Sequence, residues 1–299
     1  MEIRRHVHGD GRLWTLTCIA RDDGFRVASV IIVGKDEVVV VDTQWTLSNA
    51  HRVVAEIFSL NKRLKAIFCT HAHPDHYFGT QVFTDAFPGV PVYALEEDIP
   101  VIADQFLPKL DHWKAQIGDV NCADRPIEFT PYRDGCLDLD GSKIEVMPKV
   151  WGDLKYNSVV WVPSIKTVIC SDVVFNGAHP FTCEVTRKGR KGWIQDLERI
   201  RGLGAEVIIP GHAKRDMPFD ESGLDYTREY LIATDEELDA ISARQGRGGV
   251  FEFYYNMDKR FFDSKLKMSN EMNANVFLGG REWNDLWNED MDEDADAEG

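Results

Sequence analysis

The chain has 299 residues and a formal net charge of −16, with 43% hydrophobic and 11% aromatic residues. Enough apolar material is present for a large buried core, which excludes a mainly disordered chain. The acidic balance argues against a nucleic-acid partner, because phosphate binding needs a basic face. No apolar run reaches the roughly 18 residues that a membrane-spanning helix needs, so we expect no membrane partner.

The first half of the chain predicts strands interspersed with helices. Apolar, β-branched runs bounded by glycine and aspartate predict strands over 13–18, 27–33, 37–41, 66–69 and 90–94. An apolar stripe at helical spacing predicts a helix over 47–60. Pro74 is well placed to begin another helix directly after a polar cluster. An irregular helical segment over 95–119 is interrupted by Pro100 and Pro108.

The second half repeats the order of strands followed by helices. We expect strands over 127–129, 136–139, 143–150, 157–162, 167–170 and 206–209. Helices are predicted over 192–202 and 220–244, and the apolar pieces 250–255 and 275–278 pack on the body or on another subunit. No linker separates the halves, which favours an α+β fold, a four-layer αββα sandwich, in one domain over residues 1–280.

The C-terminus and the cysteines differ from the rest of the composition. Seven of the last twelve residues are acidic and none is basic, so residues 281–299 are expected to be a disordered acidic tail. Six cysteines at irregular spacings, with no export signal, indicate reduced thiols. The sequence therefore predicts a cytoplasmic protein.

The strongest chemical signal is the run His71-x-His73-x-Asp75-His76, which follows an apolar strand. Imidazole and carboxylate ligands together suit zinc and neighbouring divalent metals. Alternation along an extended stretch places His71 and His73 on one side, whereas Asp75 and His76 follow a turn. One short segment can therefore supply ligands to two metal positions. A polar loop that is histidine-rich by chance is the alternative.

Two further candidates follow apolar strands elsewhere in the chain. Asp172 comes just after the strand predicted over 167–170, and His212 comes just after the one over 206–209. Each alone would be an ordinary loop residue. Their shared placement just past the end of a strand predicts that they join the histidine-rich run in one site.

With these residues in place, the sequence resembles the metallo-β-lactamase superfamily over nearly all of residues 13–245. The resemblance is carried by VVVVDT at 38–43, THAHPDHYFG at 70–79, CSDVVF at 170–175 and IIPGH at 208–212. It implies an αββα sandwich with metals at one edge and a nearby supporting acid at Asp42. The metal ligands that it implies are His71 and His73 for a first metal, Asp75, His76 and His212 for a second, and Asp172 bridging the two.

One ligand departs from the family pattern. The usual third histidine of the first metal, about twenty residues before the bridging aspartate, is absent from residues 150–158. The resemblance extends to a branch with Gly-Asp in this turn, which makes Asp153 the expected replacement. An aspartate oxygen binds zinc at about the same distance as a histidine nitrogen. The alternative is a solvated turn aspartate beside a weak or empty first site.

Other residues near these motifs are candidates for the pocket. The same branch carries Asn-Gly-x-His after the bridging aspartate, and here the run ends at His179. His179 is predicted to donate to the substrate or carry a proton, with a surface or supporting histidine as the alternative. Tyr77 and Phe78 are expected in the pocket wall. Residues 105–117 form either a lid over the pocket or an ordinary buried helix face.

The resulting prediction is a metal-dependent hydrolase that acts on a small molecule. Two divalent metals can share a water and lower its pKa toward about 7, so that hydroxide attacks a polarised carbonyl. Asp75 is the candidate that takes the proton. A lactam or lactone is the leading substrate class, as in some fungal lactamases of the superfamily. Two zinc ions per chain are expected, with iron and manganese as alternatives.

Three other functions stay open at this point. The superfamily also includes thioester hydrolases of the glyoxalase II and polyketide-releasing kinds. A mononuclear iron enzyme of the persulfide-dioxygenase kind shares much of this ligand set but typically uses only the first site. The missing histidine also allows a non-catalytic binding protein on a degenerate scaffold. The sequence does not indicate an oligomeric state.

Overall fold

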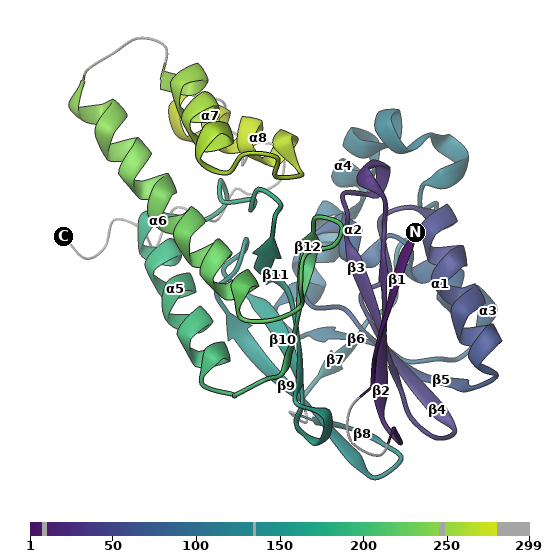
Figure 1. Cartoon of the computed structure of the whole chain (residues 1–299). Coiled ribbons are helices and arrows are strands. Elements are labelled where there is room, and N and C mark those ends of the chain that lie inside the picture. The colour runs from purple at the N-terminus through teal and green to yellow at the C-terminus, as the bar shows by residue number, and fades with distance from the viewer. Residues whose placement is uncertain (8–10, 134–135, 245–248, 280–299) are drawn as a thin grey trace.

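Two β-sheets lie face to face, and helices cover their outer faces (Figure 1). This arrangement is seen in a computed structural model that describes residues 1–7, 11–133, 136–244 and 249–279. It confirms the predicted α+β class and the four-layer αββα sandwich. The expected acidic tail, residues 281–299, lies outside the described residues, and the single domain over 1–280 stays a prediction.

The first sheet has seven strands in sequence order. The strands are β1 (Glu2–Val7), β2 (Trp14–Ile19), β3 (Ala28–Val33), β4 (Glu37–Val41), β5 (Arg63–Phe68), β6 (Val92–Leu95) and β7 (Thr130–Tyr132). β1 to β4 pair antiparallel, whereas β4 to β7 pair parallel. The parallel connections contain α1 (Leu47–Leu60), α2 (Pro74–Tyr77), α3 (Thr80–Ala86) and α4 (Asp98–Ile117).

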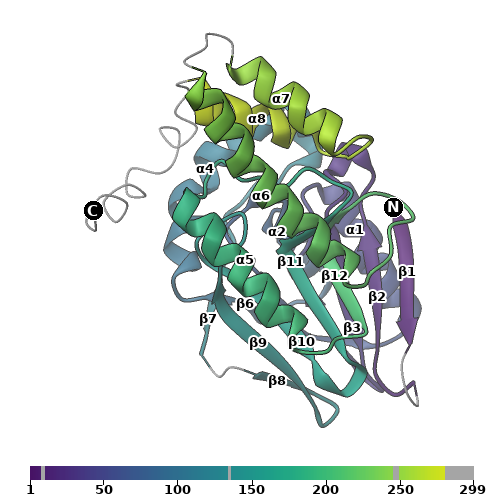
Figure 2. The same cartoon turned by 60° about the vertical axis from the view of Figure 1, so that its left-hand side comes forward.

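The second sheet has five strands in the order β12-β11-β10-β9-β8. Their bounds are Cys136–Leu139 for β8, Ser142–Val150 for β9, Asn157–Val162 for β10, Thr167–Asn176 for β11 and Val207–Ala213 for β12. Figure 2 shows the helices α5 (Arg187–Arg201) and α6 (Ser222–Ala243) across its outer face. The chain then adds α7 (Gly249–Arg260) and α8 (Lys267–Leu278), which pack on α6. Short 3-10 turns occur at Asp22–Gly24, Asp119–Asn121 and Pro163–Ile165.

The sandwich is built from strands that are apolar on both faces. In β3, Val30 and Ile32 belong to the core between the two sheets, whereas Ile31 and Val33 pack with Val53 of α1. Successive side chains of a strand point to opposite faces, so an uninterrupted apolar strand can serve two layers at once. This explains why the apolar residues of these strands are consecutive in the sequence and do not alternate with polar ones. None of the described helices is long and apolar enough to cross a bilayer.

Several predicted elements differ from the observed ones. β1 was not predicted, because its outward-facing half is charged and the strand lies at the edge of the sheet. The pieces 250–255 and 275–278 lie in the helices α7 and α8. α4 runs without a break through Pro108, while Pro100 sits in its first turn, where no intrahelical N–H bond is lost.

Candidate metal centre

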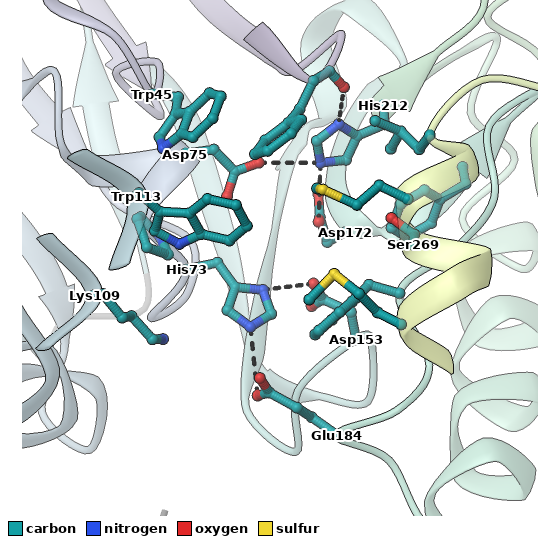
Figure 3. Close-up of a pocket in the computed structure, with 17 residues that line it drawn as sticks. Trp45, His73, Asp75, Lys109, Trp113, Asp153, Asp172, Glu184, His212 and Ser269 are labelled. Atoms are coloured by element: carbon teal, nitrogen blue, oxygen red, sulfur yellow. Dashed lines mark hydrogen bonds and ion pairs between the residues drawn. The ribbon is translucent and has the colours of Figure 1, made fainter. Parts of the chain in front are cut away.

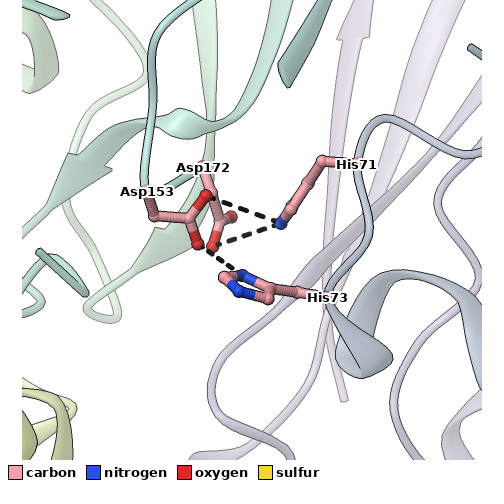
Figure 4. A group of neighbouring side chains, drawn as sticks. All are labelled: His71, His73, Asp153 and Asp172. Carbon is pink, nitrogen blue, oxygen red and sulfur yellow. Dashed lines mark hydrogen bonds and ion pairs between the residues drawn. The ribbon is translucent and has the colours of Figure 1, made fainter. Parts of the chain in front are cut away.

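The seven predicted ligands meet at the end of the sandwich where β5, β11 and β12 lead into the site. Potential ligand atoms of four of them lie within 4.8 Å of one another, and those of the other three do likewise. The first group is His71, His73, Asp153 and Asp172, drawn in Figure 4. The second group is Asp75, His76 and His212. Segments far apart in the sequence therefore converge in space as predicted from their motifs.

The side chains of the first group are buried at the inner end of the site. His73 Nδ1 lies 2.7 Å from Asp153 Oδ2, and His71 Nε2 lies 3.7 Å from Asp153 Oδ1 (Figure 4). Asp172 Oδ2 lies 4.0 Å from the same His71 nitrogen. All four side chains are buried. Asp153 thus stands with the two histidines and is not a solvated turn aspartate.

Asp172 also reaches the second group. Its Oδ1 lies 3.2 Å from His76 Nε2, and its Oδ2 lies 3.1 Å from His212 Nε2. Within the second group, Asp75 Oδ2 lies 3.4 Å from His212 Nε2 and 3.6 Å from His76 Nε2. Asp172 therefore occupies the position between the two groups.

The strand ends were predicted too early at two of these residues. Asp172 lies inside β11 and His212 lies inside β12, not beyond them. The pairing of β11 with β12 shifts register on both sides of Ser171, whose φ is 46°. Such an irregularity bends a strand without ending it. The strands therefore continue past the irregularity, and the polar residues of the site are part of the sheet.

The outward-facing nitrogens of the histidines are held by protein oxygens. Asp42 Oδ2 lies 2.8 Å from His76 Nδ1, and the carbonyl oxygen of Phe25 lies 2.6 Å from His212 Nδ1. Thr70 Oγ1 lies 3.0 Å from His71 Nδ1 and also donates to Asp42. A nitrogen that donates outward leaves the Nε2 lone pair directed at the site. The expectation that Asp42 is a nearby supporting acid agrees with these contacts.

Atoms without partners show what this centre can hold. His71 Nε2, His76 Nε2, Asp153 Oδ1 and Asp172 Oδ1 are buried and form no well-oriented hydrogen bond among the described residues, although Asp172 Oδ1 lies 3.2 Å from His76 Nε2 and Asp153 Oδ1 lies 3.7 Å from His71 Nε2. Unpaired buried polar atoms are costly, so each needs a partner that the protein does not supply. Nitrogen and carboxylate oxygen donors that face one another fit divalent metal ions. The donor set therefore fits bound metal.

The ionisation of the histidines is consistent with a need for positive charge here. Burial lowers the pKa of these imidazoles and prevails at His71, whose pKa lies well below its ordinary value, whereas at His73 and His212 the neighbouring carboxylates outweigh it. Asp153 raises the pKa of His73 to about 10, and Asp172 raises the pKa of His212 to about 10. In the protein alone, protons on these rings compensate the buried acids. Divalent cations in the same place would do so more completely.

A cavity of about 630 Å³, open solvent at its mouth included, leads to this centre (Figure 3). Asp75, Asp153 and Asp172 line it, together with groups that the sequence reasoning missed. Those groups are the polar side chains Lys109, Glu184 and Ser269 and the apolar side chains Phe25, Trp45, Phe175, Phe181, Leu266, Met268 and Met272. Phe175 ends the CSDVVF motif and Lys109 lies in the segment 105–117, but no motif marks the others, which come from separate elements that only the fold brings together.

Two predictions about the pocket wall have different outcomes. The segment 105–117 lies in α4, which places Lys109 and Trp113 in the cavity while Phe106 faces the core. Tyr77 and Phe78 were predicted in the wall, and this is wrong. Both are fully buried in the apolar cluster beside α4, because the short α2 turns them inward.

His179 is not brought to the metal centre. It is fully buried, with Nδ1 at 3.2 Å from Tyr230 Oη and Nε2 at 3.7 Å from Asp258 Oδ1. It does not line the cavity among the described residues. The loop after β11 carries it toward α6 and α7 instead. This placement favours a supporting histidine over a proton carrier.

Sequence comparison relates this chain to known metal-dependent proteins. The sequence profile described as the metallo-beta-lactamase superfamily matches residues 22–212. The 2,4-dinitroanisole O-demethylase subunit alpha of Nocardioides sp. (strain JS1661) is 27% identical over 209 residues, which is 68% of this chain and 55% of that protein. A probable metallo-hydrolase of Streptococcus pyogenes serotype M6 is 36% identical over 67 residues, 22% of this chain and 28% of that one. The chain thus spans about half of the first relative and less of the second.

Solved structures agree on the fold. A metallo-beta-lactamase from Pontibacter korlensis has a TM-score of 0.59 and 20% identity, covering 77% of this chain and 99% of that one. A metallo-beta-lactamase from Hirschia baltica has a TM-score of 0.55 and 17% identity, covering 77% of this chain and 98% of that one. At these identities the likeness concerns the arrangement of the chain and not its substrate.

Proposed function

The chain belongs to the metallo-β-lactamase superfamily, and from this premise we propose that it is a two-metal hydrolase that opens a lactam or lactone ring in a small molecule. The observation that supports two metals is the position of Asp172: its two oxygens lie 3.2 Å from His76 Nε2 and 3.1 Å from His212 Nε2 in the second group, and Oδ2 also lies 4.0 Å from His71 Nε2 in the first group. A mononuclear enzyme would have no use for the complete second group. The buried atoms without partners add to this support.

The reaction chemistry follows from the donors and the cavity. Bound divalent metals would supply Lewis acidity, polarising a carbonyl and lowering the pKa of water toward about 7. His71, His73 and Asp153 would hold one metal, Asp75, His76 and His212 the other, and Asp172 would lie between them. We expect zinc, because the donors are nitrogen and carboxylate oxygen.

Asp75 is the residue best placed to move a proton. It lines the cavity, and its carboxylate lies beside both His76 and His212. Burial alone raises the pKa of a carboxyl, but His76 and His212 outweigh it and lower the pKa of Asp75. Asp75 is therefore ionised and able to accept a proton from water and pass it to the leaving group.

The proposal also covers the type of substrate and the location of the protein in the cell. The walls of the cavity are mostly apolar and aromatic, which suits a small ring compound with the reacting carbonyl toward the metal centre. One relative is named for the O-demethylation of 2,4-dinitroanisole, itself an aromatic small molecule. Five cysteines are free and buried, in keeping with a cytoplasmic protein.

The test combines metal analysis with a hydrolysis panel. The full chain is loaded with zinc, its metal content is measured, and lactones, lactams and thioesters are assayed in parallel. We expect about two zinc ions per chain and fastest turnover on a lactone or lactam. Asp172→Ala should lose at least about 100-fold in turnover and most of its metal. Asp138→Ala, at an exposed position, is the matched control.

Three results would contradict the proposal. One iron per chain with oxygen uptake would point to an oxygenase. Preference for thioesters would contradict the lactam or lactone substrate but would still support hydrolase activity. Two firmly held metals with no turnover of any acyl substrate would leave a binding protein.

A further inference from the structure

A buried ammonium group lines the cavity without a counter-charge. Lys109 of α4 is only 3% exposed, and its Nζ donates to the carbonyl oxygen of Ala72 at 3.0 Å. Among the described residues, Lys109 forms no ion pair with a carboxylate, and Glu184, Asp75 and Asp153 are its charged neighbours. An ammonium removed from water is costly unless an anion compensates it. In Figure 3 its nitrogen points toward His73, into the cavity.

The acids in the neighbourhood are engaged elsewhere. Burial lowers the pKa of Lys109, and the more distant carboxylates of Glu184, Asp75 and Asp153 oppose this shift. Asp75 and Asp153 belong to the proposed metal ligands, and Glu184 Oε2 lies 3.4 Å from His73 Nε2. Cations at the metal centre would offset the charge of Asp75 and Asp153, whereas Glu184 would keep its contact with His73. Lys109 would then face the cavity with an even greater need for an anion.

The walls beside Lys109 have the character of an aromatic binding slot. Phe25 stacks on Trp45 with ring centroids 3.9 Å apart, and Trp113 meets Trp45 edge-on at 5.4 Å. Leu266, Met268 and Met272, at the start of α8, line the cavity as well. Figure 3 shows Trp45 and Trp113 facing the helix that carries Ser269. Aromatic rings and polarisable thioethers both favour contact with a flat conjugated ring.

The α8 wall lies outside the part of the chain that the family profile matches. That match ends at residue 212, whereas Leu266 and Met272 come from the C-terminal helices. The ligands of the metal centre all lie within the matched part. The matched part therefore supplies the ligands, Lys109 and the aromatic residues of the cavity, whereas the wall at α8 is added from outside it.

We infer that the cavity selects a planar aromatic substrate that carries a carboxylate, with the carboxylate on Lys109 and the ring between the aromatic trio Phe25, Trp45 and Trp113 and the α8 methionines. This inference rests on the proposed function, since the reacting acyl bond is placed at the metal centre. Lys109 is a specificity-determining residue here, because it binds a group of the substrate that does not react.

The test measures binding and needs no turnover. The zinc-loaded full chain is titrated calorimetrically with 2-naphthoate, with its neutral amide 2-naphthamide, and with the saturated acid decahydro-2-naphthoate. We expect 2-naphthoate to bind at least about 10-fold more tightly than either comparison ligand. Lys109→Met and Lys109→Gln should reduce the preference for acid over amide to less than about 3-fold. The Gln variant removes the charge and keeps a side-chain N–H donor on a side chain that is one bond shorter.

Controls separate this role from a structural one. Lys114→Met, at an exposed position on the same helix, should keep the full preference for the acid. Zinc per chain is measured in every variant. Loss of zinc together with equal loss of acid and amide binding would show that Lys109 only supports the loop at Ala72, and would overturn the inference. An unchanged preference in both Lys109 variants, or equal binding of the flat and saturated acids, would also overturn it.

The two proposals can fail separately. A chain that hydrolyses no acyl substrate but binds naphthoate through Lys109 contradicts the hydrolase and supports the inferred slot. A chain that hydrolyses neutral lactones and shows no Lys109-dependent preference for the acid supports the hydrolase and contradicts the slot.

Discussion

Asp153 is the residue at which this chain departs from the usual ligand pattern, and its replacement by asparagine isolates the effect of charge. Asn keeps the size of the side chain but removes the carboxylate that faces His71 and His73. We expect the affinity of the first group for zinc to fall at least about 10-fold. Metal content per chain, measured over a series of buffered free zinc concentrations, should then drop in two separated steps.

The matched control is Asp138→Asn, which makes the same substitution at an exposed carboxylate. It should leave both zinc affinities unchanged. If Asp153→Asn binds zinc as tightly as the unaltered chain, Asp153 is a buried hydrogen-bond partner of His73 and no ligand.

At the scale of residues, predictability depended on how much chemistry one residue type carries within a short motif. His71 to His76 could be found because four potential ligands stand within six positions. Asp153 could be found only by its place in a turn. Lys109 gave no signal, because a lone lysine on a helix is ordinarily a surface residue. The prediction for His179 failed because this residue is close to Asp172 in the sequence but lies beside Tyr230 in the structure.

Among the elements, β12 passes so close to β11 that only glycine fits at one position. A Cβ atom on Gly211 would lie 2.0 Å from Asp172 Oδ1 and 2.5 Å from the carbonyl carbon of Ser171. Backbone atoms in a paired strand cannot move away easily. We expect Gly211→Ala to cost about 1–3 kcal/mol of unfolding free energy and to lower zinc content by displacing Asp172. Urea denaturation and metal analysis measure the two effects.

Gly202→Ala is the comparison for that substitution. Its added Cβ would meet Arg199 O at 3.3 Å at the end of α5, a tight contact but far less severe than the 2.0 Å at Gly211. It should change stability by less than about 1 kcal/mol and leave zinc content intact. If the two substitutions change stability and zinc content equally, β11 shifts to accommodate the extra methyl group, which would contradict the prediction for Gly211→Ala.

The start of α4 contains a buried acid that predicts a pH dependence of stability. Burial, together with the charge of Glu97, raises the pKa of Asp98 to about 8 from an ordinary 3.8. The folded protein therefore keeps this carboxyl protonated at pH values where the unfolded chain ionises it. Its contribution to stability is complete below about pH 4 and is lost as the pH rises to about 8.

Asp98→Asn removes this dependence because the amide stays neutral in both states. We expect the variant to gain stability over the unaltered chain between pH 5 and pH 8, by about 1–2 kcal/mol at pH 8. The gain is kept small because the first turn of a helix favours a carboxylate. Urea denaturation at several pH values measures it, with Asp111→Asn on the exposed side of α4 as control. A difference that does not change with pH would contradict the prediction.

For the elements, the sequence predicted those that are apolar throughout and missed those that depend on their neighbours. The bounds predicted for β4, α1 and β10 agree with the observed ones. α7 was not predicted as a helix, since aromatic residues favour strands and only packing on α6 makes the segment helical. The full length of β11 was hidden by the irregularity at Ser171.

At the scale of the whole molecule, two large sheets must come together around a group of buried acids. Asp42, Asp153 and Asp172 are all at most 3% exposed, and they lie where strands of both sheets meet. Burying carboxylates this close together is unfavourable unless positive charge accompanies them. The apolar core between the sheets stabilises the sandwich, and we expect bound metal to offset the cost of burying these acids.

The stability of the whole chain should therefore depend on free zinc. A metal that binds only the folded state adds about 1.4 kcal/mol per site for each tenfold rise in its concentration above the dissociation constant. We expect a chelator to lower the melting temperature and added zinc to restore it, with the shift growing as the logarithm of free zinc. Asp172→Ala, which removes the residue between both groups, should show a much smaller shift. A melting temperature that is the same with chelator and with excess zinc would mean that protons on the histidines suffice to hold the two sheets together.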